Sequence, residues 1–285
     1  MSQNTSHPTS SSKNRGRTPS LGKAVVTGAS TGIGALYADR LARRGYDLIL
    51  VARNRERLEA LARHLADTTH RSVEVLAADL ADRSGLREVE ERLQDDPTIT
   101  MLVNNAGVAA AGPLLASDVD KMEAMIDINV TALTRLTYAA VPGFVKRGKG
   151  TVVNISSIVA VYPERLNGVY GATKAFVLAF SQSLQHELSD KGIRVQAVLP
   201  GATRTPLWAL AGVDIEQLPK EIVMDAGEMV DAALAGLDQG EFATVPALPE
   251  LADWNAFESA RLAMAPKLSR SAPAARYAVA TKALN

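Results

Sequence analysis

The chain has 285 residues, of which 47% are hydrophobic and 22% are charged, a composition typical of a globular protein with room for one large α/β domain. Its 31 basic and 31 acidic residues cancel, so the net charge gives no indication of a nucleic-acid or membrane partner. The absence of cysteine excludes disulfides, thiol catalysis and zinc–thiolate sites.

The first twenty residues are polar and rich in serine and threonine. Such a segment buries too little apolar surface to offset the entropy of ordering it, so we expect residues 1–20 to form a disordered tail. The segment also lacks the apolar region of a secretory signal, which favours a cytoplasmic location. No linker rich in Pro, Gly or Ser divides the remainder, and residues 21–285 are therefore predicted to form a single domain.

From Lys23 onwards, short apolar runs alternate with stretches of helical periodicity. Continuous apolar strands separated by helices indicate βαβ units and a parallel sheet that is covered on both faces. We therefore predict an α/β fold with one doubly wound parallel sheet of about seven strands, and a ligand at the carboxyl ends of those strands. The predicted strands are 23–28, 47–53, 72–80, 99–107, 150–157, 193–201 and 241–250, and the predicted helices are 33–46, 55–69, 83–96, 118–146 and a helix from Val169.

A glycine-rich turn follows the first predicted strand, where Gly28, Gly32 and Gly34 stand in the sequence GASTGIG. Glycine lets the backbone turn tightly and approach a phosphate, and the N-terminus of the next helix offers unpaired N–H groups. The pattern indicates a pyrophosphate site. A turn without a ligand would have the same composition, and the spacing departs from the usual G-x-G-x-x-G.

The end of the second strand discriminates between cofactors. A carboxylate about 20 residues after the glycines would bind the ribose 2′-hydroxyl of NAD. Here Arg53 stands at that place in LVARNRER and no acid is present, which favours the 2′-phosphate of NADP. The alternative is that Arg53 is a solvated loop cation, which is how we interpret Arg55 and Arg57.

Several motifs at strand ends form a joint signature. They are TGASTGIG at 27–34, NNAG at 104–107, Asn129 in IDINVTAL, NISS at 154–157, VYGATK at 169–174 and PGATRT at 200–205. Between about Lys23 and Pro206 the chain resembles the short-chain dehydrogenase/reductase family, and most of all its NADP-dependent bacterial branch. The resemblance implies a Rossmann-type fold and an oxidoreductase that transfers a hydride between a nicotinamide and a carbonyl or alcohol substrate.

The resemblance also implies a set of site residues. The catalytic tetrad would be Asn129, Ser157, Tyr170 and Lys174. The cofactor would be NADP(H), favoured over NAD(H), in contact with Thr27, Gly28, Ser30, Thr31, Gly32, Ile33, Gly34, Arg53, Asp79, Leu80, Asn105, Ala106, Gly107, Tyr170, Lys174, Pro200, Gly201, Thr203 and Thr205. The family usually forms dimers or tetramers through its fourth and fifth helices, which implies a homodimer or homotetramer through residues 118–146 and the Tyr170 helix.

Tyr170 and Lys174 are four residues apart, so a helix places them on one face. Hydride transfer to a carbonyl leaves negative charge on oxygen, which must be stabilised and protonated. A tyrosine has a pKa of about 10, and a neighbouring ammonium such as that of Lys174 favours the phenolate. In the family's pattern, Ser157 orients the substrate oxygen and the side chain of Asn129 holds a water that links Lys174 to solvent. The Tyr-x-x-x-Lys spacing alone is a weak motif, and the other motifs make it specific.

Residues 206–223 follow the sixth strand, and we expect them to form a variable lid over the site. The lid would be apolar, which predicts a partly apolar ketone or aldehyde as substrate. A helix packed on its own core would explain its Leu and Trp residues equally well. The residues expected to contact the substrate are Val159, Tyr162, Leu207 and Trp208, with Leu210 beside them.

Other features are less informative. Residues 250–285 form an Ala-rich, basic C-terminal extension that is predicted to be partly helical. The four histidines lack metal-ligand spacing, so no metal is expected. Two alternative functions remain: a cofactor-binding regulatory protein on the same fold, which typically loses the Tyr or the Lys, and an isomerase or epimerase, which normally has a longer substrate domain.

Overall fold

The computed structural model describes residues 19–277, so the tail expected at the N-terminus falls almost entirely outside the described residues. The chain divides into two compact units, one ending at Pro246 and one beginning at Ala247. The single domain proposed for residues 21–285 stays a prediction, and each unit is described separately below.

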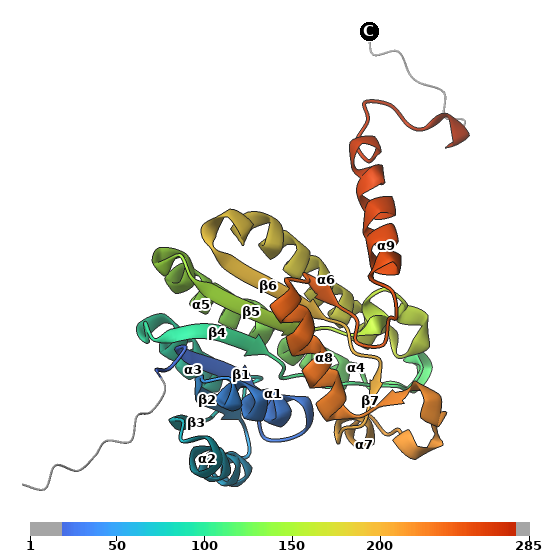
Figure 1. Ribbon diagram of the computed structural model, residues 1–285. Helices are drawn as coiled ribbons and strands as arrows, with labels where there is room; N and C mark the ends of the chain where they lie inside the picture. The colour runs from blue at the N-terminus through green and yellow to red at the C-terminus, as the bar shows by residue number, and fades with distance from the viewer. Residues whose placement is uncertain (1–18, 278–285) are drawn as a thin grey trace, which may run out of the picture. The chain divides into compact units, whose positions relative to one another are not determined.

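The first unit is built on a seven-stranded parallel sheet with the strand order β3-β2-β1-β4-β5-β6-β9 (Figure 1). A second, two-stranded sheet pairs β7 with β8. The prediction of a doubly wound parallel sheet is confirmed. The strands are β1 (Lys23–Thr27), β2 (Asp47–Ala52), β3 (Val73–Ala77), β4 (Ile99–Asn104), β5 (Gly150–Ile155), β6 (Ile193–Val198), β7 (Ala202–Thr203), β8 (Val223–Met224) and β9 (Ala243–Thr244).

Helices connect the strands and cover both faces of the sheet. The expected helix over residues 118–146 is interrupted by a π-helical segment, Asp127–Ala132, which separates α4 from α5. The helices of the first unit are α1 (Gly32–Arg43), α2 (Arg55–Thr69), α3 (Arg83–Asp95), α4 (Val119–Ile126), α5 (Leu133–Arg147), α6 (Gly168–Leu188), α7 (Leu207–Leu210) and α8 (Ala226–Gln239).

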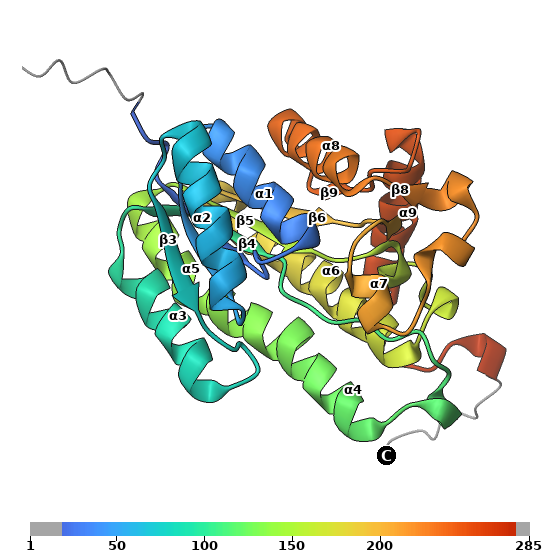
Figure 2. The ribbon, with the colours of Figure 1, turned by 90° about the horizontal axis from the view of Figure 1, so that it is seen from below.

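Two apolar cores form, one on each face of the sheet. One core lies under α1, α2 and α8, and the other lies under α3, α5 and α6. Figure 2 shows α1 between α2 and α8. Successive side chains of a strand point to opposite faces, and the fully buried Val26 and Val25 therefore belong to different cores. Full burial of such a side chain contributes about 1.5–3 kcal/mol, which explains why the strands read as continuous apolar runs.

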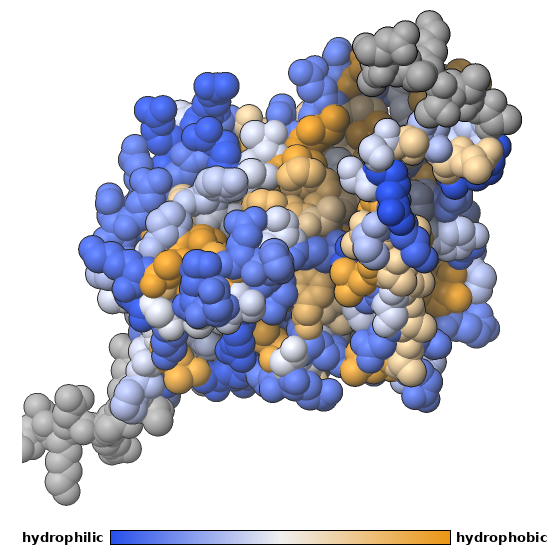
Figure 3. Space-filling view, turned by 90° about the horizontal axis from the view of Figure 1, so that it is seen from above, coloured by the Kyte–Doolittle hydropathy of each residue, from blue (hydrophilic) through white to orange (hydrophobic). Residues whose placement is uncertain are grey.

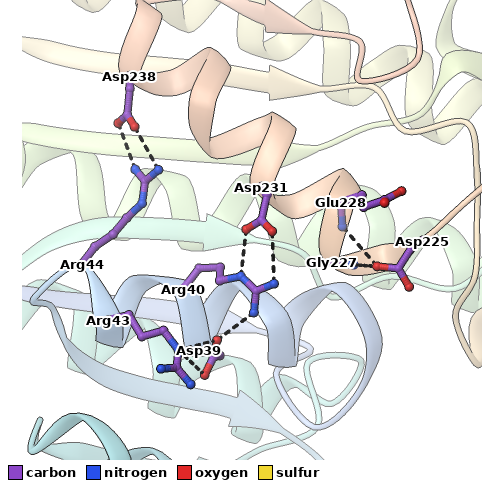
Figure 4. Close-up of polar contacts among 9 residues, drawn as sticks. All are labelled: Asp39, Arg40, Arg43, Arg44, Asp225, Gly227, Glu228, Asp231 and Asp238. Carbon is purple, nitrogen blue, oxygen red and sulfur yellow. Dashed lines mark hydrogen bonds and ion pairs between the residues drawn. The ribbon is translucent and has the colours of Figure 1, made fainter.

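Ion pairs hold α1 against α8 (Figure 4). Arg40 donates to Asp231 (Nε–Oδ1, 2.8 Å) and to Asp39 (Nη1–Oδ2, 2.8 Å), and Arg44 pairs with Asp238 (Nη2–Oδ2, 2.9 Å). Exposed pairs are each worth only about 0–1 kcal/mol, so the pairs orient the two helices more than they stabilise the fold. The relative orientation of these two helices affects the position of the glycine-rich turn, which α1 follows, and of β8, which α8 follows.

The second unit contains α9 (Leu251–Met264). Within this helix the rings of Trp254 and Phe257 lie 5.4 Å apart, and Arg261 pairs with Glu258 one turn earlier (Nη2–Oε2, 2.7 Å). The helix confirms that part of the C-terminal extension is helical. Across both units, residues 19–277 include no helix with the length and apolar character needed to cross a membrane.

Candidate active site

The strand order reverses direction at β1, which pairs with β2 on one side and with β4 on the other. The loops that leave these strands diverge there, as is usual where ligands bind in open parallel sheets. A crevice of about 600 Å³ lies at this point. Leu207, which is expected to contact the substrate, lines this crevice. Most residues assigned to the cofactor line it too, namely Gly28, Ser30, Thr31, Gly32, Ile33, Arg53, Asp79, Leu80, Asn105, Ala106, Gly107 and Thr205.

The glycine-rich turn needs residues without a side chain at two places. Gly28 has a φ of +65°, and a Cβ there would lie 2.8 Å from Nδ2 of Asn105 and 2.9 Å from Cα of Ala106. A Cβ on Gly34 would overlap the carbonyl oxygen of Gly28. The turn therefore lies directly on the loop that follows β4, and its backbone is left free to approach a ligand from the crevice.

Thr27 and Gly34 are placed behind this turn and do not line the crevice. The buried Thr27 hydroxyl accepts the N–H groups of Asn105 and Ala106, both at 3.0 Å, and donates to the Val103 carbonyl at 3.2 Å. The Asn105 amide donates to the Thr27 carbonyl at 2.8 Å. Thr27 thus ties the loop after β4 to the glycine-rich turn.

The N-terminus of α1 faces the crevice without a side-chain cap. Thr31 precedes the helix but makes no capping hydrogen bond, and the first turn contains no acidic residue. By contrast, Asn54 caps α2 by accepting the Arg57 N–H at 2.9 Å. Because unpaired N–H groups and the positive end of the helix dipole favour an anion, the start of α1 fits the pyrophosphate of a dinucleotide.

Two arginines lie at the other end of the crevice. Arg53 is where the sequence predicts it, and Arg57, interpreted from sequence as a solvated cation, also lines the crevice. Arg55 instead points to Glu59, with 3.9 Å between Nη1 and Oε1. Helical side chains lean towards the helix N-terminus, which brings the Arg57 side chain back to the end of β2. The sequence shows a basic residue, Arg57, in the first turn of the predicted helix, but it does not show how close that helix lies to the glycine-rich turn.

Further lining residues were not assigned from the sequence. Most are small or apolar, and most neighbour an assigned position at the end of a strand or in a loop. Leu210 is expected from the sequence only in the lid. The residues are Ala52, Asn54, Ala78, Val108, Ile128, Pro206 and Leu210.

Ser157, Tyr170 and Lys174 meet at the carboxyl end of β5. Tyr170 and Lys174 lie in the first two turns of α6, and each is only 7% exposed. The Lys174 ammonium donates to the Ile155 carbonyl at 2.9 Å and lies 5.8 Å from the centre of the Tyr170 ring. The Ser157 hydroxyl follows the same strand and donates to the Pro200 carbonyl at 3.3 Å.

Burial controls the protonation of the two groups. It raises the pKa of Tyr170 to about 12, an effect that the neighbouring Ser157 hydroxyl partly offsets. It lowers the pKa of Lys174 to about 8. From the sequence we expect Lys174 to favour the phenolate, whereas in the structure desolvation is the largest influence on the pKa of Tyr170. Tyr170 therefore holds its proton at neutral pH, as a group that protonates an oxygen must.

Asn129 lies in the π-helical segment, where irregular helix geometry often accompanies functional residues. Its buried amide accepts the Val108 N–H at 2.9 Å and donates to the Val108 carbonyl at 2.9 Å and the Thr173 hydroxyl at 3.1 Å. A Cβ on Gly107 would lie 3.0 Å from Oδ1 of Asn129 and 3.6 Å from Nζ of Lys174. The side chain thus joins the loop after β4 to α6, and its expected role in holding a water stays a prediction.

After β6, residues 199–204 lie outside the crevice, whereas Thr205, Pro206, Leu207 and Leu210 line it. The Pro200 carbonyl accepts from Ser157, and the Thr203 hydroxyl donates to the Gly201 carbonyl at 3.1 Å. The indole Nε1 of Trp208 donates to the Thr203 carbonyl at 2.8 Å. The segment therefore connects the Ser157 region with the expected lid.

The residues expected to contact substrate differ in their surroundings. Val159 is buried against Tyr170 and Met125, so it supports the tyrosine ring, whereas Tyr162 is exposed. Leu207 lines the crevice. None of the helical turns between residues 207 and 222 contains a buried side chain, which favours a lid over a helix with its own core.

Within residues 19–277, no group of three or more His, Cys, Asp or Glu is arranged to hold a metal.

A family model for short chain dehydrogenases matches residues 22–214 of this chain. The chain belongs to the short-chain dehydrogenase family. The resemblance seen in the sequence, and the assignment to an oxidoreductase family that it implied, are confirmed.

Solved structures and a curated relative agree with this assignment. A short-chain dehydrogenase from Sphingobium yanoikuyae, in complex with NADPH, is 49% identical over 90% of this chain and 100% of its own, with a TM-score of 0.88. A bulky-bulky ketone specific alcohol dehydrogenase from Comamonas testosteroni is 43% identical over 91% of this chain and 99% of its own, with a TM-score of 0.84. An uncharacterized oxidoreductase of Staphylococcus epidermidis is 33% identical over 217 residues, which are 76% of this chain and 90% of that protein.

Proposed function

We propose that the protein is an NADPH-dependent reductase of partly apolar ketones or aldehydes, with Tyr170 as the general acid. The observation that carries the proposal is a buried Tyr170 with Ser157 and Lys174 at its side, next to a crevice suited to a dinucleotide. In the reverse direction Tyr170 would act as the base and the substrate would be an alcohol.

The crevice suits NADP(H) by its residues. Gly28, Gly32 and the uncapped start of α1 would hold the pyrophosphate, and Arg53 and Arg57 would pair with the 2′-phosphate. No carboxylate at the end of β2 repels that phosphate. When bound, NADPH supplies the hydride.

The side chains of the protein perform the remaining work. The Tyr170 hydroxyl would donate its proton to the carbonyl oxygen, and the Ser157 hydroxyl would hold that oxygen by a second hydrogen bond. Lys174, with a pKa of about 8, is mostly protonated at neutral pH and adds positive charge beside the developing alkoxide. Asn129 would keep the loop after β4 against α6 and so fix the distance between the two sides of the site.

The lid supports an apolar substrate. Leu207, Trp208 and Leu210 are not buried, and they belong to a segment that Trp208 anchors near the end of β6. The Comamonas testosteroni relative is specific for bulky-bulky ketones, which supports a ketone as the substrate of this chain.

We also infer that the protein forms a homodimer or homotetramer through α4, α5 and α6. An apolar groove of about 720 Å³ lies between α4 and α6, lined by Leu114, Ser117, Val119, Met122, Ile126, Val130, Asn167, Gly168, Val169, Ala172 and Thr173. The stacked rings of Tyr138, Phe176 and Phe180 lie on α5 and α6. On the face shown in Figure 3, apolar side chains gather in the middle of the surface. Light scattering tests the inference, and the molar mass of a single chain would contradict it.

The cytoplasmic location stays a prediction.

The function is tested by measuring NADPH and NADH oxidation against a panel of ketones, aldehydes and quinones. We expect turnover of apolar ketones with NADPH, and much weaker turnover with NADH. Binding of NADPH without turnover of any carbonyl in the panel would contradict the proposal and favour the regulatory alternative.

A further inference from the structure

Asn167 is a buried residue three positions before Tyr170, and the reaction proposed above does not use it. It is only 4% exposed. Its Oδ1 accepts the N–H groups of Val169 at 2.9 Å and Tyr170 at 3.4 Å, which caps α6. Its Nδ2 donates to the Gly112 carbonyl at 2.7 Å and to the Ser117 hydroxyl at 3.0 Å. A neutral amide can donate two hydrogen bonds and accept two, so this one is fully used.

The partners of Nδ2 belong to residues 108–117, the segment between β4 and α4, which we call the β4 wall. At its start, Val108, Ala109 and Ala110 pack against the buried cluster that contains Tyr170. At its end, Leu114 and Leu115 are 82% and 96% exposed in the single chain, so apolar burial within the chain does little to hold the wall there; Leu114 and Ser117 line the groove inferred above to be an interface between copies. The position of the outer part of the β4 wall therefore depends on hydrogen bonds.

Two asparagines anchor the β4 wall to α6, one on each side of Tyr170. Asn129 holds Val108 and the hydroxyl of Thr173, three residues after Tyr170. Asn167 holds the other end, three residues before Tyr170. The wall and the tyrosine are thereby fixed to each other at two points.

Ordinary capping does not explain this side chain. Serine and aspartate cap helices as well as asparagine does, but they lack an amide that donates twice. Asparagine alone caps α6 and holds both Gly112 and Ser117.

We propose that Asn167 is a positioning residue for substrate binding, which fixes the β4 wall against the start of α6 and so sets the width of the substrate site beside Tyr170. This inference rests on the proposed reductase function. The residue acts on the carbonyl substrate and not on the dinucleotide, because Asn167 and the wall residues that it binds, Gly112 and Ser117, do not line the cofactor crevice; the wall residue that does is Val108, which Asn129 holds.

Asn167→Ser separates the two roles, because a serine hydroxyl retains a cap acceptor while the amide donors are lost. Asp225→Ser is the matched control: Asp225 caps α8 by accepting the N–H groups of Gly227 at 2.7 Å and Glu228 at 3.2 Å. Ser117→Ala removes one of the two bonds that Asn167 makes to the wall, together with the bonds of the serine hydroxyl to the Gly112 and Pro113 carbonyls, and keeps the cap. All three variants are compared with the wild-type full chain.

The measurements are the KM for an apolar ketone, the KM for NADPH, and amide hydrogen exchange of residues 109–117. For Asn167→Ser we expect a ketone KM raised about tenfold, as for the loss of one or two hydrogen bonds, with an NADPH KM changed less than about twofold. We expect a smaller rise, about threefold, for Ser117→Ala. Exchange in the β4 wall should be faster in Asn167→Ser and unchanged in Asp225→Ser.

If Asn167→Ser only lowers thermal stability, as Asp225→Ser does, and leaves exchange and ketone KM unchanged, Asn167 is a helix cap and the inference is wrong. If the wild type reduces no carbonyl, the proposed function is wrong. Unchanged exchange in Asn167→Ser would then still refute the anchoring of the wall, whereas faster exchange would support it independently of turnover.

Discussion

The substitution Lys174→Met tests whether the lysine beside Tyr170 is held in the folded protein at the expense of stability. The ammonium is buried, and burial lowers its pKa from an ordinary value of 10.5 to about 8. A methionine of similar shape removes the charge and keeps most of the apolar contacts.

The sign and size of the effect follow from proton linkage. Below about pH 8 the lysine is charged in the folded and unfolded states, and the folded state bears the full penalty of burying the charge. Between about pH 8 and 10.5 the unfolded state binds a proton that the folded state has released, so the free energy of unfolding rises with pH. At 1.36 kcal/mol per pKa unit, the difference between 10.5 and about 8 corresponds to about 3 kcal/mol.

The assay is urea unfolding of the wild type and Lys174→Met at about pH 7 and pH 10. The free energy of unfolding of the wild type, relative to the variant, should rise by about 2–3 kcal/mol between these values. Tyr170, whose pKa burial raises, is present in both proteins, so its contribution cancels to first order. Lys146→Met, at an exposed position on α5, is the control and should show no such change. If the free energy of unfolding of the wild type minus that of Lys174→Met is constant or falls with pH, the reasoning is refuted.

Three further predictions concern the cofactor and the lid. Alanine at Arg53 or at Arg57 should raise the KM for NADPH about tenfold or more and leave that for NADH unchanged, whereas Arg55→Ala should alter neither; equal losses with both cofactors would contradict a 2′-phosphate site. Gly34→Ala should weaken NADPH binding in calorimetry, because the added Cβ would overlap the Gly28 carbonyl oxygen and displace the glycine-rich turn. Unaltered affinity for NADPH would contradict a pyrophosphate site at this turn. Trp208→Ala should raise the KM for a bulky ketone more than for a small one, and an equal effect on both would exclude a lid role.

The elements that the sequence predicted well carry a strong local pattern. The predicted helix 55–69 coincides with α2, because an amphipathic stripe begins directly after the capping residue Asn54. The order of strands and helices also followed from alternating apolar runs. These signals depend on neighbours in the chain, and tertiary packing reinforced them.

The features that were missed depend on residues far apart in sequence. The π-helical segment around Asn129 is stabilised by bonds to Val108, 21 residues earlier, and no local pattern distinguishes it from an α-helix. Asn167 binds Gly112, 55 residues earlier. The raised pKa of Tyr170 is likewise a consequence of burial, which spacing to Lys174 does not reveal.

The most direct test of the account is the rate of NADPH oxidation by Tyr170→Phe with an apolar ketone, measured beside direct NADPH binding to the same protein. Removal of the hydroxyl should lower turnover at least about a hundredfold, as for loss of a general acid, while NADPH affinity changes less than about twofold. Turnover equal to that of the wild type would contradict the assignment of Tyr170 as the proton donor.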